Sequence, residues 1–339
     1  MSQLYKVTSS PHIRHEDTTR GIMFDVIIAL VPAALFGCFL FGWKALLILA
    51  TTIGVAIGSE ALWNKILGKK QTIGDLSAVL TGLLLGMNLS SETPLWIAAI
   101  GSVVAIIVVK QMFGGLGQNF ANPAIAARVV LLLSFARQIS VYSDPLAWAS
   151  GAKAGADVVS SATPLASETA ITLKQLFLGM HPGAIGETSS FLLIIGGLYL
   201  IARKVIKPII PVAFIGTVAI ATLIAGAFTT VDFKTAIFGG GLMLGAIFMS
   251  TDYVTTPTTD LGKLIFGIGC GLVTFIIRQF TPLPEGVSYS ILVMNIVTPH
   301  INRLTLSKPF GFAKAAKYDK LLSKIKSFTK AKQDKEALK

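Results

Sequence analysis

Long apolar runs recur along the whole chain, and they restrict the folds that it can adopt. Ten stretches approach the length that a bilayer requires. They lie near residues 21–41, 45–63, 76–89, 95–109, 121–135, 191–201, 209–228, 236–248, 264–280 and 287–301. Only 14% of the 339 residues are charged, whereas soluble domains carry about 25%. The sequence therefore predicts an all-α polytopic membrane protein with about ten transmembrane helices.

Basic residues indicate the orientation of these helices, because positive charge stays on the cytoplasmic side of a membrane. With the N-terminus inside, the basic positions that follow the second, fourth and sixth stretches all fall in the cytoplasm. They are Lys65, Lys69, Lys70, Lys110, Arg203, Lys204 and Lys207. We expect a multi-pass membrane protein with both termini in the cytoplasm.

This topology divides the chain into five parts. We expect a cytoplasmic N-terminal segment over residues 1–20, a first five-helix unit over 21–135, an outer-face loop over 136–190, a second five-helix unit over 191–303 and a basic cytoplasmic tail over 304–339. The tail spaces apolar residues among lysines, as in a helix that lies on anionic membrane lipids, and a solvated basic tail is the alternative.

The two halves share a short pattern. Gly82-Leu83-Leu84-Leu85-Gly86 with Ser91 aligns with Gly241-Leu242-Met243-Leu244-Gly245 with Ser250, each in the third stretch of its half. Five helices per half would give the two halves opposite orientation, so the pattern predicts two inverted five-helix repeats with a site near the membrane midplane. Close helix packing at glycines explains the same pattern without a repeat.

The outer loop contains a candidate cofactor attachment site. Asp157, Ser160, Ser161, Ala162 and Thr163 fit the pattern D-x-x-[S/T]-[G/S]-A-[T/S], at which a flavin transferase esterifies FMN through its phosphate onto the last hydroxyl. Small neighbours leave the Thr163 hydroxyl open, and Asp157 is suited to orient the acceptor or to bind the metal of the transferase. An ordinary Ser/Thr/Ala loop is the alternative. The pattern predicts covalent FMN on Thr163.

Two further polar clusters interrupt the apolar stretches. One includes Asn119 and Asn122 in the segment 114–123, and the other includes Thr251 and Asp252 in the segment 249–260. Their amides, hydroxyls and carboxylates suit contacts to a flavin or to a partly dehydrated ion. A re-entrant turn and helix capping are the structural alternatives.

Ionisable residues within or beside apolar stretches are candidates for an ion pathway, because charge at membrane depth is costly. Asp25, Glu60, Asp75, Asp232, Arg278 and His300 are in this class, and we select Asp25, Glu60 and Asp252 for ion passage. The sequence predicts no metal site and no catalytic residues of its own. Cys38 and Cys270 are expected to be buried thiols.

At these residues the chain resembles the RnfD/NqrB family of flavin-carrying membrane subunits, and its RnfD members in particular. The matching segments are 117–124, the acceptor pattern at Thr163, 250–257 and 285–295. Ser161 departs from the glycine that is more frequent in the family. RnfD is the D subunit of the Rnf ferredoxin:NAD oxidoreductase complex, and the chain begins close to its first span, whereas NqrB has a longer N-terminal extension.

The resemblance implies a fold similar to that of urea and ammonium transporters, FMN on Thr163 and a possible second, non-covalent flavin such as riboflavin. It also implies membership of a bacterial inner-membrane complex with the Rnf A, B, C, E and G subunits, and a flavin transferase as a partner during maturation. The chain would then be a non-autonomous subunit of an electron-transport complex that moves Na+ or H+. Three alternatives remain: an NqrB-like subunit of a Na+-translocating NADH:quinone reductase, a redox-inactive channel or transporter, and a scaffold for soluble partners. Nucleic acid is not an expected partner.

Overall fold

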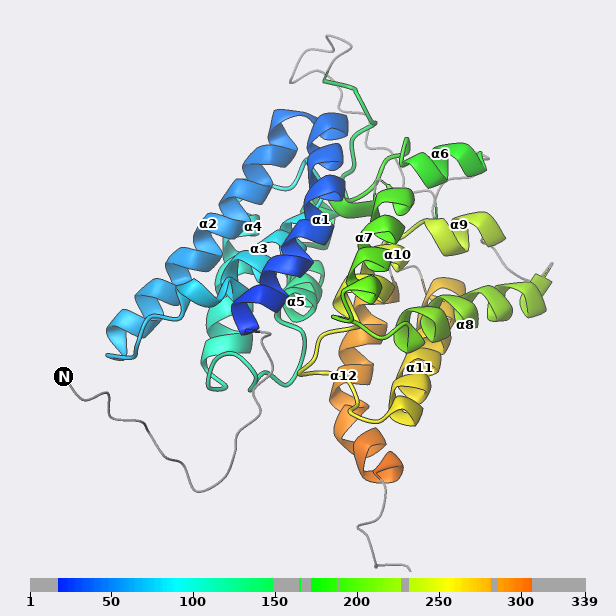
Figure 1. The fold of residues 1–339 in the computed structure, drawn as a ribbon. Helices are drawn as coiled ribbons and strands as arrows, with labels where there is room; N and C mark the ends of the chain where they lie inside the picture. The colour runs from blue at the N-terminus through cyan, green and yellow to red at the C-terminus, as the bar shows by residue number, and fades with distance from the viewer. Residues whose placement is uncertain are drawn as a thin grey trace, which may run out of the picture.

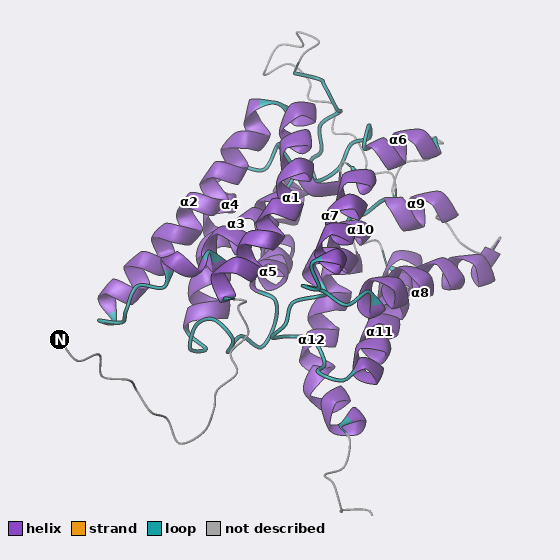
Figure 2. Cartoon of the chain, viewed as in Figure 1, coloured by secondary structure: helices purple, strands orange, loops and turns teal. Residues whose placement is uncertain are grey.

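The computed structural model describes residues 18–148, 165, 172–187, 189–226, 232–281 and 286–306. Helices joined by loops make up this part of the chain, and no β-strand occurs in it (Figure 2). The all-α prediction is therefore confirmed for the described residues.

The helices of the first half gather on one side of the molecule (Figure 1). They are α1 (Thr19–Phe41), α2 (Trp43–Ile66), η1 (Ile73–Asp75), α3 (Ser77–Met87), α4 (Leu95–Val103), its π-helical continuation η2 (Val104–Gln111) and α5 (Pro123–Ile139). Helix α2 packs against α3, α4 and η2, and α5 contacts α3 and α4.

The helices of the second half occupy the other side (Figure 1). They are α6 (Leu173–Leu178), η3 (Ile185–Glu187), α7 (Ser190–Ala202), α8 (Ile209–Ala225), α9 (Phe233–Phe238), α10 (Leu242–Leu244), η5 (Gly245–Met249), α11 (Asp260–Phe280) and α12 (Gly286–Thr305). Helix α11 packs against α8 and α12. The halves meet where α1 contacts α7 and where α5 contacts α12, so one buried apolar core runs through both.

Three described helices, α1, α2 and α11, are long and apolar enough to cross a membrane. Helices α3, α7 and α8 and the combined segment Leu95–Gln111 are apolar but shorter. The chain is therefore a membrane protein by length and composition of its helices. The ten spans and the inverted repeat stay predictions.

The eighth predicted stretch, 236–248, is not one helix. Helix α9 ends at Phe238, and the backbone turns at Gly240 and Gly241, where φ is +63° and +68°. The chain then continues as two short helices, α10 and η5. Glycine tolerates this left-handed backbone because it has no Cβ, so the interruption follows from the Gly239-Gly240-Gly241 run.

Local sequence also sets where α5 begins. The Asn122 side-chain Oδ1 accepts hydrogen bonds from the backbone N–H groups of Ala124 at 3.0 Å and of Ile125 at 3.4 Å. Pro123 occupies the first helical position, where its missing N–H costs nothing. The non-helical segment 114–122 therefore ends at Asn122, which caps the N-terminus of α5.

Candidate functional site

A cavity of about 280 Å³ opens between α1, α3 and the loops that contain Asn119 and Asp252. It lies at the end of the bundle where α1 begins. Apolar side chains make up most of its wall, including Leu80, Leu84 and Phe248. Such a mostly apolar hollow with a few convergent polar groups is typical of a small-molecule site.

All four described residues of the predicted cofactor set line this cavity: Asn119, Asn122, Thr251 and Asp252. They come from two segments that lie far apart in the sequence. The Asn122 side-chain Nδ2 donates to the carbonyl of Met249 at 3.1 Å, which ties the two segments together. The structure therefore brings both predicted polar clusters to one place.

Asp252 lines this cavity, and its carboxylate is hydrogen-bonded within the protein. The Thr255 Oγ1 donates to its Oδ2 at 3.1 Å, and the nearby Asn119 Nδ2 donates to the carbonyl of Ala121 at 2.9 Å. Burial raises the pKa of the Asp252 carboxyl above its ordinary value, and the hydrogen bonds oppose this rise without cancelling it. Asp252 is thus a carboxyl group that takes up a proton more readily than an exposed one.

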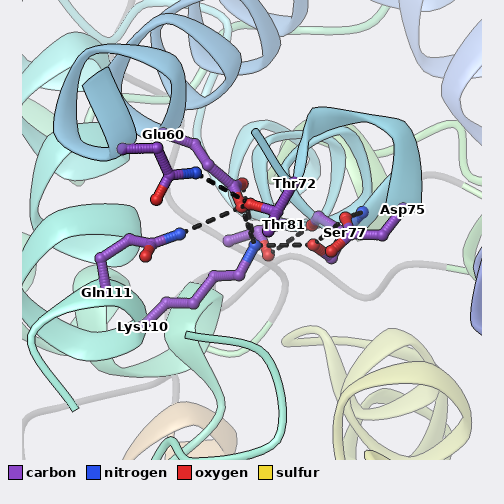
Figure 3. Close-up of polar contacts among 8 residues, drawn as sticks. Glu60, Thr72, Asp75, Ser77, Thr81, Lys110 and Gln111 are labelled. Carbon is purple, nitrogen blue, oxygen red and sulfur yellow. Dashed lines mark hydrogen bonds and ion pairs between the residues drawn. The ribbon is translucent and has the colours of Figure 1, made fainter. Parts of the chain in front are cut away.

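A buried polar network borders the cavity (Figure 3). The Lys110 Nζ donates to Glu60 Oε1 at 3.0 Å and to Oε2 at 2.8 Å, and the exposed fractions of the two side chains are 3% and 0%. Gln111 Nε2 and Thr72 Oγ1 also donate to Glu60 Oε1, at 3.0 and 2.5 Å. Glu60 therefore accepts four hydrogen bonds.

The network continues from Lys110 toward the rim. The third hydrogen bond of Lys110 Nζ goes to Ser77 Oγ at 2.6 Å, and Ser77 Oγ donates to Asp75 Oδ1 at 2.5 Å. Lys110 thus has an acceptor for each of its three N–H groups. Both Lys110 and Ser77 line the cavity, whereas Glu60 lies behind them.

Sequence reasoning missed Lys110 as a site residue, because it treated this lysine as a cytoplasmic charge that sets orientation. A usable signal was present: Lys110 ends one apolar run and Glu60 lies inside another. Two opposite charges in adjacent apolar helices are expected to pair, since an isolated charge there is costly.

The remaining ion-pathway candidates lie outside the cavity. Asp25 accepts from the Tyr199 hydroxyl at 3.0 Å and from Arg203 at 3.1 Å, which draws it toward α7. Asp232 is at the N-cap of α9 without a side-chain capping bond, and His300 is exposed on α12. These contacts do not test an ion pathway.

Two buried arginines hold helix and loop ends inside the bundle. Arg128 donates to the carbonyl and to the Oδ1 of Asn88, which ends α3. Arg278 donates to the carbonyls of Ala236, Gly239 and Gly240 at 2.6–3.1 Å, where the eighth stretch breaks. Neither arginine was predicted to have this role. Carbonyls left open at a broken helix need such donors.

The acceptor pattern Asp157, Ser160, Ser161, Ala162 and Thr163 lies outside the described residues. Leu165, two residues after Thr163, is described and contacts the turn at Gly240. Cys38 and Cys270 are free thiols, and the described residues contain no group of three or more His, Cys, Asp or Glu side chains that could hold a metal ion.

Comparisons with known proteins cover almost the whole chain. Residues 6–311 match the model of the NQR2, RnfD, RnfE family. The chain is 45% identical over 320 residues to the D subunit of the Na(+)-translocating ferredoxin:NAD(+) oxidoreductase complex of Acetobacterium woodii, covering 92% of this chain and 96% of that protein.

Two further relatives are also named as D subunits. That of the proton-translocating ferredoxin:NAD(+) oxidoreductase complex of Clostridium ljungdahlii is 43% identical, with 91% of this chain and 96% of that protein covered. That of the ion-translocating oxidoreductase complex of Stutzerimonas stutzeri is 37% identical, with coverage of 86% and 91%. The match over most of the length, at these identities, shows that the chain belongs to the NQR2, RnfD, RnfE family and resembles its D subunits.

Proposed function

We propose that this chain is the flavin-carrying D-type membrane subunit of an ion-translocating ferredoxin:NAD oxidoreductase complex. The observation that carries the proposal is the convergence of Asn119, Asn122, Thr251 and Asp252 on one cavity, since these are the described residues predicted to bind a cofactor. The names of the relatives support the type of complex.

We infer that the cavity binds a non-covalent flavin such as riboflavin. Its volume of about 280 Å³ is near the lower end for ligand pockets, so it suits a single ring system rather than a dinucleotide. The apolar wall at Leu80, Leu84 and Phe248 suits the faces of a planar ring. Amide, hydroxyl and carboxyl groups would bind its polar edge. A flavin bound here supplies one- and two-electron redox chemistry.

Thr163 would carry the second flavin, FMN, through a phosphate ester. Support comes from the acceptor pattern and from the family to which the chain belongs. A covalent bond would retain the cofactor on the outer face, where a dissociated flavin would be lost. Electrons would pass between this flavin and the A, B, C, E and G subunits of the complex, after a flavin transferase has attached it.

We also propose ten spans in two inverted repeats, with Thr163 outside and both termini in the cytoplasm. Two matching contacts support the repeat. Lys110 binds Ser77 at the start of α3, and Arg278 binds the carbonyls of Gly239 and Gly240 just before α10. The residues that precede these short helices, Leu76 and Gly241, both have left-handed backbone, with φ of 63° and 68°.

For ion translocation we propose Asp252 as the group that faces the cavity. Asp25 and Glu60 would act only after releasing their present cationic partners, because each carboxylate accepts from a basic side chain. Relatives of 45% and 43% identity are named for sodium and for protons respectively, so overall similarity does not choose the ion.

Fluorescence of the denatured chain tests the covalent cofactor. The full chain, coexpressed with a flavin transferase, should give a band that fluoresces under ultraviolet light after denaturing electrophoresis, and Thr163→Val should remove the band but not membrane insertion. A band that survives Thr163→Val would refute this attachment site, and a dark wild-type band would favour a redox-inactive channel or a scaffold.

Riboflavin retention tests the cavity. In the Thr163→Val background, the purified chain should hold about one releasable riboflavin, and Asn119→Ala should weaken its binding because the ring edge loses a hydrogen-bonding amide. Phe113→Leu, outside the cavity on an exposed side chain, is the matched control. Equal retention in the two variants would contradict this assignment of the cavity.

A further inference from the structure

The Glu60–Lys110 pair has a direction relative to the cavity. Lys110 lines the wall, and Glu60 lies behind it with no exposed surface. Figure 3 shows the lysine side chain reaching the carboxylate from η2, with Thr72 and Ser77 around it. The ion pair is therefore a dipole whose positive end is nearer to the cavity.

Stability alone is a poor explanation for this pair. Taking two charges out of water costs several kcal/mol per ion, and apolar residues of similar volume often stabilise a protein as well or better. Lys110 also commits all three N–H groups to Glu60 and Ser77, so it has none left to donate to a ligand. Its effect on the cavity must act through its electric field.

We propose that the Glu60–Lys110 pair sets the reduction potential of a flavin ring bound in the cavity, with Lys110 as the stabilising charge and Glu60 as the counter-charge that limits it. This inference rests on the proposed function. When the ring accepts one electron without a proton, it gains one negative charge. A nearby ammonium favours that added charge, and a carboxylate opposes it.

Among the described residues, Asp252 is the acidic residue on the cavity wall. It comes from the loop after η5, whereas Lys110 comes from the end of η2. A ring between them would have a cationic group toward the first half of the chain and a carboxyl group toward the second half. Replacing Lys110 or Glu60 changes the charge only on the side of the ring that faces the first half of the chain.

The experiment measures the midpoint potential of riboflavin bound to the purified full chain in the Thr163→Val background. Dithionite with mediators supplies the electrons, and absorbance reports the bound flavin. Lys110→Met should shift the potential to more negative values because the stabilising charge is gone. Glu60→Gln should shift it to more positive values because the ammonium is no longer neutralised, while Gln still accepts from Lys110 and Thr72.

Two more variants separate this role from a structural one. The double variant Glu60→Gln/Lys110→Met removes both charges, so its potential should lie between those of the single variants. Lys44→Met is the matched control: Lys44 pairs with Glu92 at 2.7 Å near the opposite end of α2, about 24 Å from Glu60 along the helix, and should leave the potential unchanged.

The signs of the shifts decide the outcome. Potentials that move in the same direction for Lys110→Met and Glu60→Gln, or that do not move, would overturn the inference and leave the cavity assignment intact. A wild-type cavity that retains no riboflavin would instead refute the proposed function, and this inference with it.

Discussion

Replacing one partner of the buried Glu60–Lys110 pair should cost far more stability than replacing both partners. Lys110→Met removes two of the four hydrogen bonds to the Glu60 carboxylate together with its only cationic partner among them. Removing one partner of a buried ion pair typically costs about 3–5 kcal/mol. We expect Lys110→Met to fall within that range, because Gln111 and Thr72 still donate to the remaining carboxylate.

Glu60→Gln should cost about 3 kcal/mol, at the lower end of the same range. The amide oxygen still accepts from Lys110, and Ser77 still accepts the third N–H of the ammonium. In the double variant neither charge is left unpaired, so it should cost no more than the milder single variant. The coupling energy, which is the sum of the two single costs minus the double cost, would then be at least about 3–5 kcal/mol, at or above the upper end for contacting residues.

Denaturant unfolding of the purified chain in detergent micelles measures these costs. Tryptophan fluorescence reports the transition, and Trp63 lies one helical turn from Glu60 on α2. Circular dichroism confirms that each variant is folded at the start. A double-variant cost equal to the sum of the two single costs would mean that the residues do not interact, and it would refute the reasoning.

Two further predictions concern helix packing and pH. Gly82→Ala should destabilise the chain by about 1–3 kcal/mol in the same assay, since its Cβ would lie 2.7 Å from the Ile53 Cα. Gly54→Ala is the control: no atom lies within 4 Å of its Cβ, so it should leave stability unchanged or raise it slightly, because alanine favours a helix over glycine. Asp252→Asn should flatten the pH dependence of stability. The pKa of Asp252 is higher in the folded chain than its ordinary value, so this group stabilises the folded state fully at pH values below its ordinary pKa. That stabilisation is lost as pH rises through the folded-state pKa. Parallel pH profiles for Asp252→Asn and wild type would contradict this.

Much of the fold follows from apolar run length. The stretches 21–41, 45–63 and 264–280 became α1, α2 and α11 with ends only a few residues away, because an uninterrupted apolar run in a membrane has few alternatives to a helix. The stretch 236–248 failed as a single helix. Its three consecutive glycines permit left-handed backbone, but only the contacts of Arg278 with the Gly239 and Gly240 carbonyls fix the turn there.

The cavity was predictable in composition but not in geometry. Polar groups inside apolar sequence are costly unless they bind a partner or a ligand. This cost allowed the selection of Asn119, Asn122, Thr251 and Asp252. That both clusters meet depends on the bond from Asn122 to the Met249 carbonyl, which bridges residues far apart in the chain. Lys110 was not selected because its position after a span predicts a surface charge. Opposite charges in two apolar runs did indicate a pair, and the tertiary contact identifies Glu60 as the partner.

The same Asn122 contact bears on how the molecule can move. Its side chain caps α5 in the first half and holds the end of η5 in the second, and the neighbouring Asn88 amide reaches the Met249 sulfur at 3.1 Å. A rocking motion of one half against the other, as in many inverted-repeat carriers, would break these contacts between the halves. The passage for ions that we propose is therefore expected to open through rearranged side chains and short loops, with the two halves remaining joined throughout the cycle.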